Sequence, residues 1–241
     1  MLHIVALSGG KDSTAMALRL KEVEPSDYTY ICTPTGDELP EMEQHWSNLE
    51  LLLGQEIIRL VNPEYPTLKA LIEHMRCLPN FHMRFCTRVL KIEVAQEFYI
   101  INKPSIAYVG LRADEEDRKG GIYGDTVTQR FPLREWGWTI RDVRSYLKRK
   151  GVKIPPRTDC ARCFHQRIGE WWNLYRYYPE IYANAEIQEI EYGHTFRTVG
   201  KDSWPTSLKD LRLEFGKGRT PMKAGQLEMP WIEPVCRACS L

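Results

Sequence analysis

The first fifteen residues limit how this chain can fold more than any later segment does. An apolar run at positions 2–7 is followed at once by a loop of small, hydroxyl-bearing and charged residues: Ser8, Gly9, Gly10, Lys11, Asp12 and Ser13. Adjacent glycines let the backbone turn sharply towards an anion, and a following helix adds unpaired N–H donors and its positive dipole end. The segment therefore predicts a strand, a phosphate-binding loop and a helix. An ordinary turn with a capped helix would explain the polar residues but not the adjacent Gly-Gly-Lys.

The first two thirds of the chain alternate between strand-like and helix-like patterns. Apolar runs predict strands at 2–7, 27–32, 56–61 and 106–109, and helical periodicity predicts helices at 12–24, 40–53, 67–75 and 87–101. Such alternation indicates parallel β-α-β units with right-handed crossovers. We expect an α/β fold, a parallel twisted sheet with helices on both faces and with ligands beyond the carboxyl ends of the strands.

The pattern loosens after position 119, which suggests three regions. Residues 1–119 are expected to form the nucleotide-binding α/β core. Residues 120–155 would complete it with a mobile loop at 120–124 and an amphipathic helix at 139–150, and residues 156–241 would form a small cysteine-bearing subdomain.

Composition is that of an ordinary soluble protein, with a net charge of +1 and 27% charged residues. Net charge therefore gives no indication of a nucleic-acid partner. Nothing approaches about 18 consecutive apolar residues, and no basic segment precedes an apolar one at the N-terminus. We expect a cytoplasmic protein that does not interact with membranes.

The seven cysteines are better explained by metal ligands, redox chemistry or nucleophiles than by disulfides. Four form two C-x-x-C pairs: Cys160 with Cys163, and Cys236 with Cys239. Two such pairs could hold one Zn²⁺ ion or one [4Fe–4S] cluster, and spacing alone does not choose between them. An alternative set combines Cys86 with Cys160, Cys163 and one C-terminal cysteine.

Three later segments resemble those of a known family. The first has the pattern T-G-x-E-x-P-E and includes Thr35, Gly36 and Glu38; the second, R-x-C-T-x-x-x-K at 84–91, includes Cys86; the third, G-[IL]-R-x-[DE]-E, includes Gly110, Arg112 and Glu115. With the S-G-G-x-D-S loop, they resemble the PP-loop ATP pyrophosphatase superfamily, and within it the phosphoadenylyl-sulfate (PAPS) reductase-like clade. The resemblance covers about residues 2–180.

The resemblance implies an adenine nucleotide α-hydrolase-like fold and an enzyme that binds ATP or a PAPS-like nucleotide with Mg²⁺. Lys11 and Arg112 would stabilise charge on the phosphates, Glu115 would hold Mg²⁺ or orient Arg112, and Cys86 could be a ligand, a nucleophile or a buried residue.

Members of the clade reduce PAPS or adenylyl-sulfate, and relatives activate a substrate for sulfur insertion. The C-terminus here, Cys-Arg-Ala-Cys-Ser-Leu, differs from the E-C-G-x-H tail that carries the nucleophile of the true reductases. We therefore expect adenylyl transfer with pyrophosphate release, within sulfur metabolism, to a nucleic-acid, protein or small-molecule acceptor. A PAPS reductase and a non-catalytic nucleotide-binding module are the alternatives, and a homo-oligomer is left open.

Overall fold

A five-stranded, all-parallel sheet forms the centre of the computed structural model, which describes residues 1–120, 127–200 and 202–221. The strand order is β3-β2-β1-β4-β5. The strands are β1 (Leu2–Ala6), β2 (Tyr28–Cys32), β3 (Ile57–Arg59), β4 (Ser105–Tyr108) and β5 (Val127–Arg130). The predicted α/β fold with a parallel sheet is confirmed.

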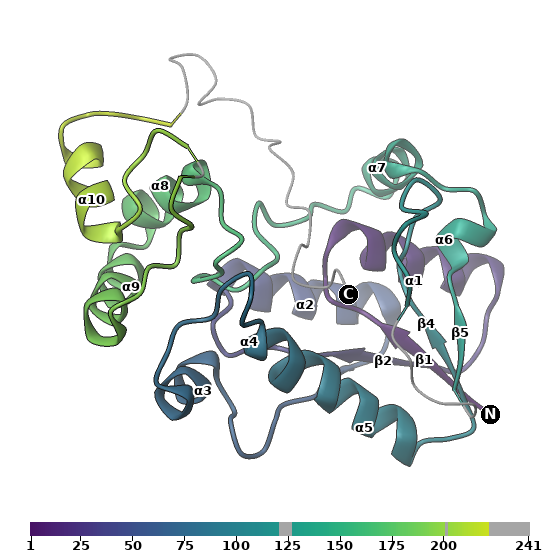
Figure 1. The fold of residues 1–241 in the computed structure, drawn as a ribbon. Coiled ribbons are helices and arrows are strands. Elements are labelled where there is room, and N and C mark those ends of the chain that lie inside the picture. The colour runs from purple at the N-terminus through teal and green to yellow at the C-terminus, as the bar shows by residue number, and fades with distance from the viewer. Residues whose placement is uncertain (121–126, 201, 222–241) are drawn as a thin grey trace.

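Helices cover both faces of this sheet, and three further helices form a separate group (Figure 1). The helices are α1 (Lys11–Val23), α2 (Pro40–Leu53), α3 (Leu68–Met75), α4 (Phe85–Thr87), α5 (Glu93–Ile101), α6 (Pro132–Glu135), α7 (Ile140–Arg149), α8 (Ile168–Tyr177), α9 (Pro179–Tyr192) and α10 (Leu208–Gly216). A π-helical turn at Arg88–Ile92 joins α4 to α5, so the helix predicted at 87–101 begins two residues earlier.

Three hydrophobic clusters fix this arrangement. One lies between the sheet and α1, α2 and α7, and includes Val5, Met16, Trp46 and Val143. A smaller cluster on the opposite face joins the sheet to α5 through Tyr99. The third packs α3 and α4 against the C-terminal helices. Each Å² of apolar surface removed from water contributes about 25 cal/mol to the stability of the folded state, so these clusters make the largest favourable contribution to folding.

The sequence patterns identified the elements of the core better than their ends. The strand predicted at 56–61 is only Ile57–Arg59, and β5 and α6 were not predicted. Residues 127–130 read Val-Thr-Gln-Arg, a short polar segment with one buried side chain, so hydrophobicity gave no signal for β5. The loop expected at 120–124 lies almost wholly outside the described residues. The three-region division stays a prediction.

No helix within residues 1–120, 127–200 and 202–221 combines the length and hydrophobicity needed to cross a bilayer.

Candidate functional site

Two predicted loops meet at the point where the strand order reverses. β1 pairs with β2 on one side and with β4 on the other, and both pairs are parallel. Residues 8–13 span the loop after β1 and the first residues of α1, and the loop after β4 carries residues 110–115. Ligands of open α/β sheets bind in the crevice outside the strand ends at such a switch point. The fold therefore brings together two segments that lie about a hundred residues apart.

The loop after β1 has the backbone conformation that its glycines predict. Gly9 has a φ of +82°, and a Cβ built there would lie 2.2 Å from the Met42 side chain and 2.8 Å from Trp46 Nε1. Any other residue would be both strained and too large at this position. Ser13 Oγ donates a hydrogen bond to the Gly10 carbonyl (3.1 Å) and lies 3.1 Å from Ser8 Oγ. The N-terminal N–H groups of α1 follow directly, as an anion-binding loop requires.

Two buried cations stand at the start of α1 and share one carboxylate. Lys11 Nζ lies 3.7 Å from Asp12 Oδ2, and Arg112 Nη1 donates a 2.7 Å hydrogen bond to the same oxygen. Lys11 is 7% exposed and Arg112 is 9% exposed. Burial raises the pKa of Asp12, although Lys11 and Arg112 oppose this shift. Both cations lie beside a helix N-terminus, whose unpaired N–H groups and dipole favour an anionic ligand.

Acidic residues of its own loop hold Arg112 in place. Arg112 Nε donates to Asp114 Oδ1 (2.8 Å), and the Arg112 backbone N–H donates to Glu115 Oε2 (3.1 Å). Glu115 Oε1 accepts a 2.6 Å hydrogen bond from Arg118. Glu115 thus contacts both Arg112 and Arg118, and its two expected roles, binding Mg²⁺ or orienting Arg112, stay predictions.

Gly110 lets the two loops come close enough to share these contacts. A Cβ at this position would lie 3.0 Å from the backbone nitrogen of Ser13 and 3.1 Å from its Cα. Backbone atoms cannot yield as a flexible side chain can, so a larger residue would push the loop after β4 away from α1. Gly110 therefore has a packing role in the site.

Sequence reasoning missed His45, a residue of α2 that contacts the loop at residues 8–10. His45 Nε2 lies 3.0 Å from the carbonyl oxygen of Gly9. Desolvation lowers the pKa of His45 to about 4, although this backbone contact opposes the shift. The ring is therefore neutral near pH 7 and donates its Nε2–H to that carbonyl. No local signal could have found this residue, because the contact joins positions 36 apart.

The loop after β2 is ordered by its own glutamate. Glu38 Oε1 accepts hydrogen bonds from the Thr35 backbone N–H (2.8 Å) and from Thr35 Oγ1 (2.7 Å). Gly36 has a φ of +66°, and a Cβ there would lie 2.7 Å from Thr67 Cγ2. Thr35, Gly36 and Glu38 thus shape this loop at the carboxyl end of β2, next to β1 in the sheet.

A buried ion pair connects this loop to the first C-x-x-C segment. Asp37 Oδ1 accepts a 2.7 Å hydrogen bond from Arg162 Nε, and Asp37 Oδ2 accepts a 3.1 Å bond from the Arg162 backbone N–H. Asp37 and Arg162 are each 8% exposed. Neither residue was predicted to matter, since 125 positions separate them. Arg162 lies inside the C-x-x-C pair, so the contact positions that turn against the core.

Comparison with known proteins shows the family to which this chain belongs. Residues 3–201 match the sequence profile of the phosphoadenosine phosphosulfate reductase domain. The chain belongs to this family. A search of curated proteins returns no match. Among solved structures, the PAPS reductase of Candida auris, a phosphate complex, superimposes with a TM-score of 0.51 at 14% identity, over 64% of this chain and 75% of that one. At this identity the likeness supports the fold alone, here an adenine nucleotide α-hydrolase-like PAPS reductase fold.

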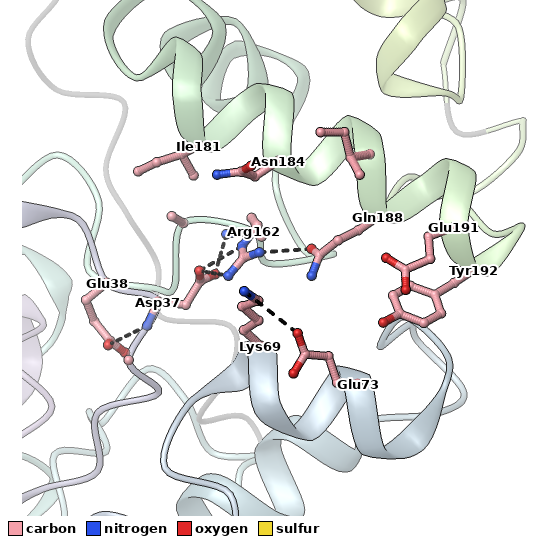
Figure 2. Close-up of a pocket in the computed structure, with 13 residues that line it drawn as sticks. Asp37, Glu38, Lys69, Glu73, Arg162, Ile181, Asn184, Gln188, Glu191 and Tyr192 are labelled. Carbon is pink, nitrogen blue, oxygen red and sulfur yellow. Dashed lines mark hydrogen bonds and ion pairs between the residues drawn. The ribbon is translucent and has the colours of Figure 1, made fainter.

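A pocket of about 500 Å³ opens beside the Asp37–Arg162 pair in this PAPS reductase domain (Figure 2). Residues 36–38 form one wall, α3 contributes Lys69 and Glu73, and α9 contributes Gln188 and Glu191. Arg162 Nη1 donates a 2.9 Å hydrogen bond to Gln188 Oε1. The pocket therefore lies between the α/β core and the C-terminal helices.

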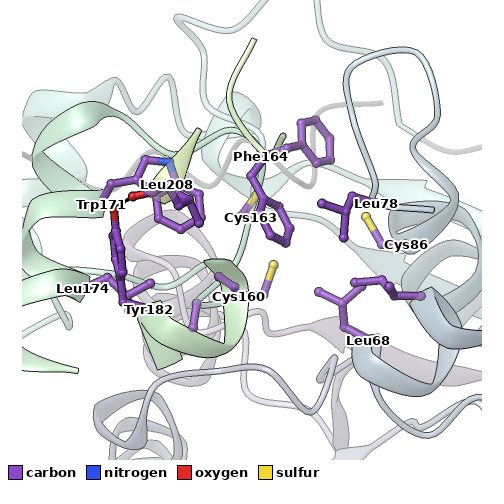
Figure 3. Close-up of a cluster of buried hydrophobic side chains, with 14 of the residues drawn as sticks. Leu68, Leu78, Cys86, Cys160, Cys163, Phe164, Trp171, Leu174, Tyr182 and Leu208 are labelled. Atoms are coloured by element: carbon purple, nitrogen blue, oxygen red, sulfur yellow. Dashed lines mark hydrogen bonds between the residues drawn. The ribbon is translucent and has the colours of Figure 1, made fainter. Parts of the chain in front are cut away.

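The fold brings three of the predicted cysteines into one hydrophobic cluster (Figure 3). Cys86, Cys160 and Cys163 are all buried, at 8%, 5% and 4% exposure. Burial raises the pKa of Cys86, so its thiol keeps its proton near neutral pH and is a weak nucleophile.

Within the described residues, no group of three or more His, Cys, Asp or Glu side chains is arranged to hold a metal ion. Cys236 and Cys239 lie outside the described residues. The predicted site of Cys160, Cys163, Cys236 and Cys239 therefore stays a prediction, as does the alternative set with Cys86.

Proposed function

We propose that this chain is an enzyme that binds an adenine nucleotide with its phosphates on residues 8–13 and reduces a sulfonucleotide such as PAPS. The observation that carries this proposal is the meeting of Lys11 and Arg112 at the N-terminus of α1, at the switch point of the sheet. Membership of the PAPS reductase domain family supports the sulfonucleotide.

Reduction requires charge stabilisation that these residues are placed to provide. A thiolate attacks the sulfuryl sulfur, the S–O bond to the nucleotide phosphate breaks, and that phosphate leaves with the electron pair. A second thiol then attacks the enzyme sulfur, which forms a disulfide and releases sulfite. Lys11, Arg112 and the first N–H groups of α1 would stabilise the leaving phosphate. Cys236 and Cys239 are the cysteines we propose to test as the nucleophile.

Adenylyl transfer is a second candidate, because residues 236–241 read Cys-Arg-Ala-Cys-Ser-Leu and differ from the E-C-G-x-H segment that carries the nucleophile of the true reductases. In that reaction the same cations would stabilise the α-phosphate of ATP while pyrophosphate leaves. Mg²⁺ in such sites is held mainly by nucleotide phosphates and water, with one or two carboxylates. The acceptor would be a nucleic acid, a protein or a small molecule.

Product analysis separates these functions. Thiol-dependent sulfite release from PAPS would support the reductase, and AMP with pyrophosphate from ATP would support adenylyl transfer. Nucleotide binding without either product would support a non-catalytic module.

Lys11→Ala and Arg112→Ala test the phosphate site itself. Losing one such charge-stabilising group costs on the order of 10²- to 10³-fold in rate. Lys209→Ala on α10 removes an exposed charge and should leave the rate unchanged. Equal rates in all three variants would contradict the proposed site.

A further inference from the structure

Positive charge is concentrated on α7 and the turn that follows it. Residues 140–153 contain six cations and one acid, whereas the whole chain carries a net charge of only +1. The cations are Arg141, Arg144, Lys148, Arg149, Lys150 and Lys153, all of them exposed. The near-neutral net charge of the chain therefore conceals a strongly basic local surface.

Helical geometry places three of these cations in one row. Val143, Tyr146 and Leu147 are buried in the cluster that α7 shares with α1. Arg141, Arg144 and Lys148 follow at spacings of three and four, so they lie together on the opposite side. At about 1.5 Å of rise per residue, the row from Arg141 to Lys148 is about 10 Å long.

Asp142 and Glu22, acids on and beside α7, contact groups outside the row of Arg141, Arg144 and Lys148. Asp142 accepts hydrogen bonds from the Thr139 backbone N–H (2.8 Å) and Oγ1 (2.7 Å) as the capping box of the helix. Glu22 of α1 pairs with Lys150 and with Arg19. In the described parts of the chain, Arg141, Lys148 and Lys153 form no ion pair. Arg141 and Lys148, at the two ends of the row, thus keep their positive charge.

The basic helix begins beside the nucleotide site. The Ile140 backbone N–H lies 3.4 Å from Asp114 Oδ2, and the other oxygen of Asp114 accepts the hydrogen bond from Arg112 Nε. α7 also packs along α1, whose N-terminus carries the phosphate loop (Figure 1). A long anionic partner on α7 would therefore reach towards the bound nucleotide.

We propose that α7 is a binding surface for the phosphate backbone of a nucleic acid. Backbone phosphates follow one another at about 3.4 Å of helix axis per strand, so a 10 Å row of cations can face about three of them. Flexible, exposed Arg and Lys side chains bind such phosphates without reading base sequence. The surface is independent of which nucleotide reaction the site performs.

The test measures binding of nucleic acid by the full chain through fluorescence anisotropy. The probes are fluorescein-labelled 20-mers of single-stranded DNA, single-stranded RNA and duplex DNA, between 50 and 200 mM NaCl, and together they distinguish the kinds of nucleic acid. One variant combines Arg141→Ala, Lys148→Ala and Lys153→Ala. The matched control combines Lys103→Ala, Lys209→Ala and Lys217→Ala, three exposed lysines that lie after α5 and at α10.

The α7 variant should bind at least about tenfold more weakly, and its slope of log K against log salt should fall by about 0.7–0.9 for each lost contact. The control has the same net charge and should change affinity less than about threefold, and ATP affinity should be unchanged in both. Equal weakening in both variants would show diffuse electrostatics and overturn the proposal. Absence of binding to every probe at 50 mM salt would overturn it as well.

Discussion

The buried pair of Asp37 and Arg162 offers the sharpest test of how this molecule is held together. It joins the loop after β2 to the C-x-x-C turn, and both side chains are 8% exposed. In Asp37→Ala the guanidinium would lose every contact with the carboxylate and, among the residues that the structure describes, keep its hydrogen bond to Gln188. A buried charge left without its partner is strongly destabilising.

The expected magnitude follows from this geometry. Removal of one partner of a buried ion pair costs about 3–5 kcal/mol, a large fraction of a typical unfolding free energy of about 5–15 kcal/mol. The double variant Asp37→Leu, Arg162→Met removes both charges and fills similar volume. Its loss of unfolding free energy should therefore be several kcal/mol smaller than the sum of the losses in Asp37→Leu and Arg162→Met.

Urea unfolding of the wild type, Asp37→Leu, Arg162→Met and the double variant completes this cycle. Asp37→Asn provides a single variant that keeps the side-chain volume if Asp37→Ala does not fold. A cost below about 1 kcal/mol for the single changes, or additive effects in the double variant, would show that the pair does not couple the loop to the turn.

Two further predictions concern His45 and the cysteines. His45 is neutral in the folded protein, with its pKa lowered from 6.5 to about 4 by burial, whereas the unfolded chain takes up a proton below pH 6.5. The unfolding free energy should therefore fall by about 3 kcal/mol as pH drops from 7 to 4. His45→Gln should lack this part of the pH dependence when urea unfolding is measured at each pH. Identical pH profiles for the wild type and His45→Gln would contradict the reasoning. If the two C-x-x-C pairs bind a metal, anaerobically purified protein should contain about one zinc or about four irons per chain, and Cys160→Ser should reduce that content. A metal-free wild type would refute the metal prediction.

The sequence identified the parts of the site that depend on short-range chemistry. Gly9, with its positive φ, and the hydroxyls of Ser8 and Ser13 all act within one turn of backbone, and their spacing predicts that turn directly. Periodicity likewise located α1, α2 and α7, because each buries one apolar face. Long-range partners carry no such signal. His45 supports Gly9 from another helix, and Asp37 meets Arg162 only after the chain has folded.

For this protein, the sequence by itself determined the phosphate loop, the alternation of strands and helices and therefore the parallel sheet, because backbone conformation and hydrophobic periodicity are local properties. Tertiary structure decided which loops meet: Arg112 reaches Asp12 across one hundred positions, and Cys86 joins Cys160 and Cys163 in one cluster. Strand order and crossover packing set these contacts, and neither is encoded in any short segment.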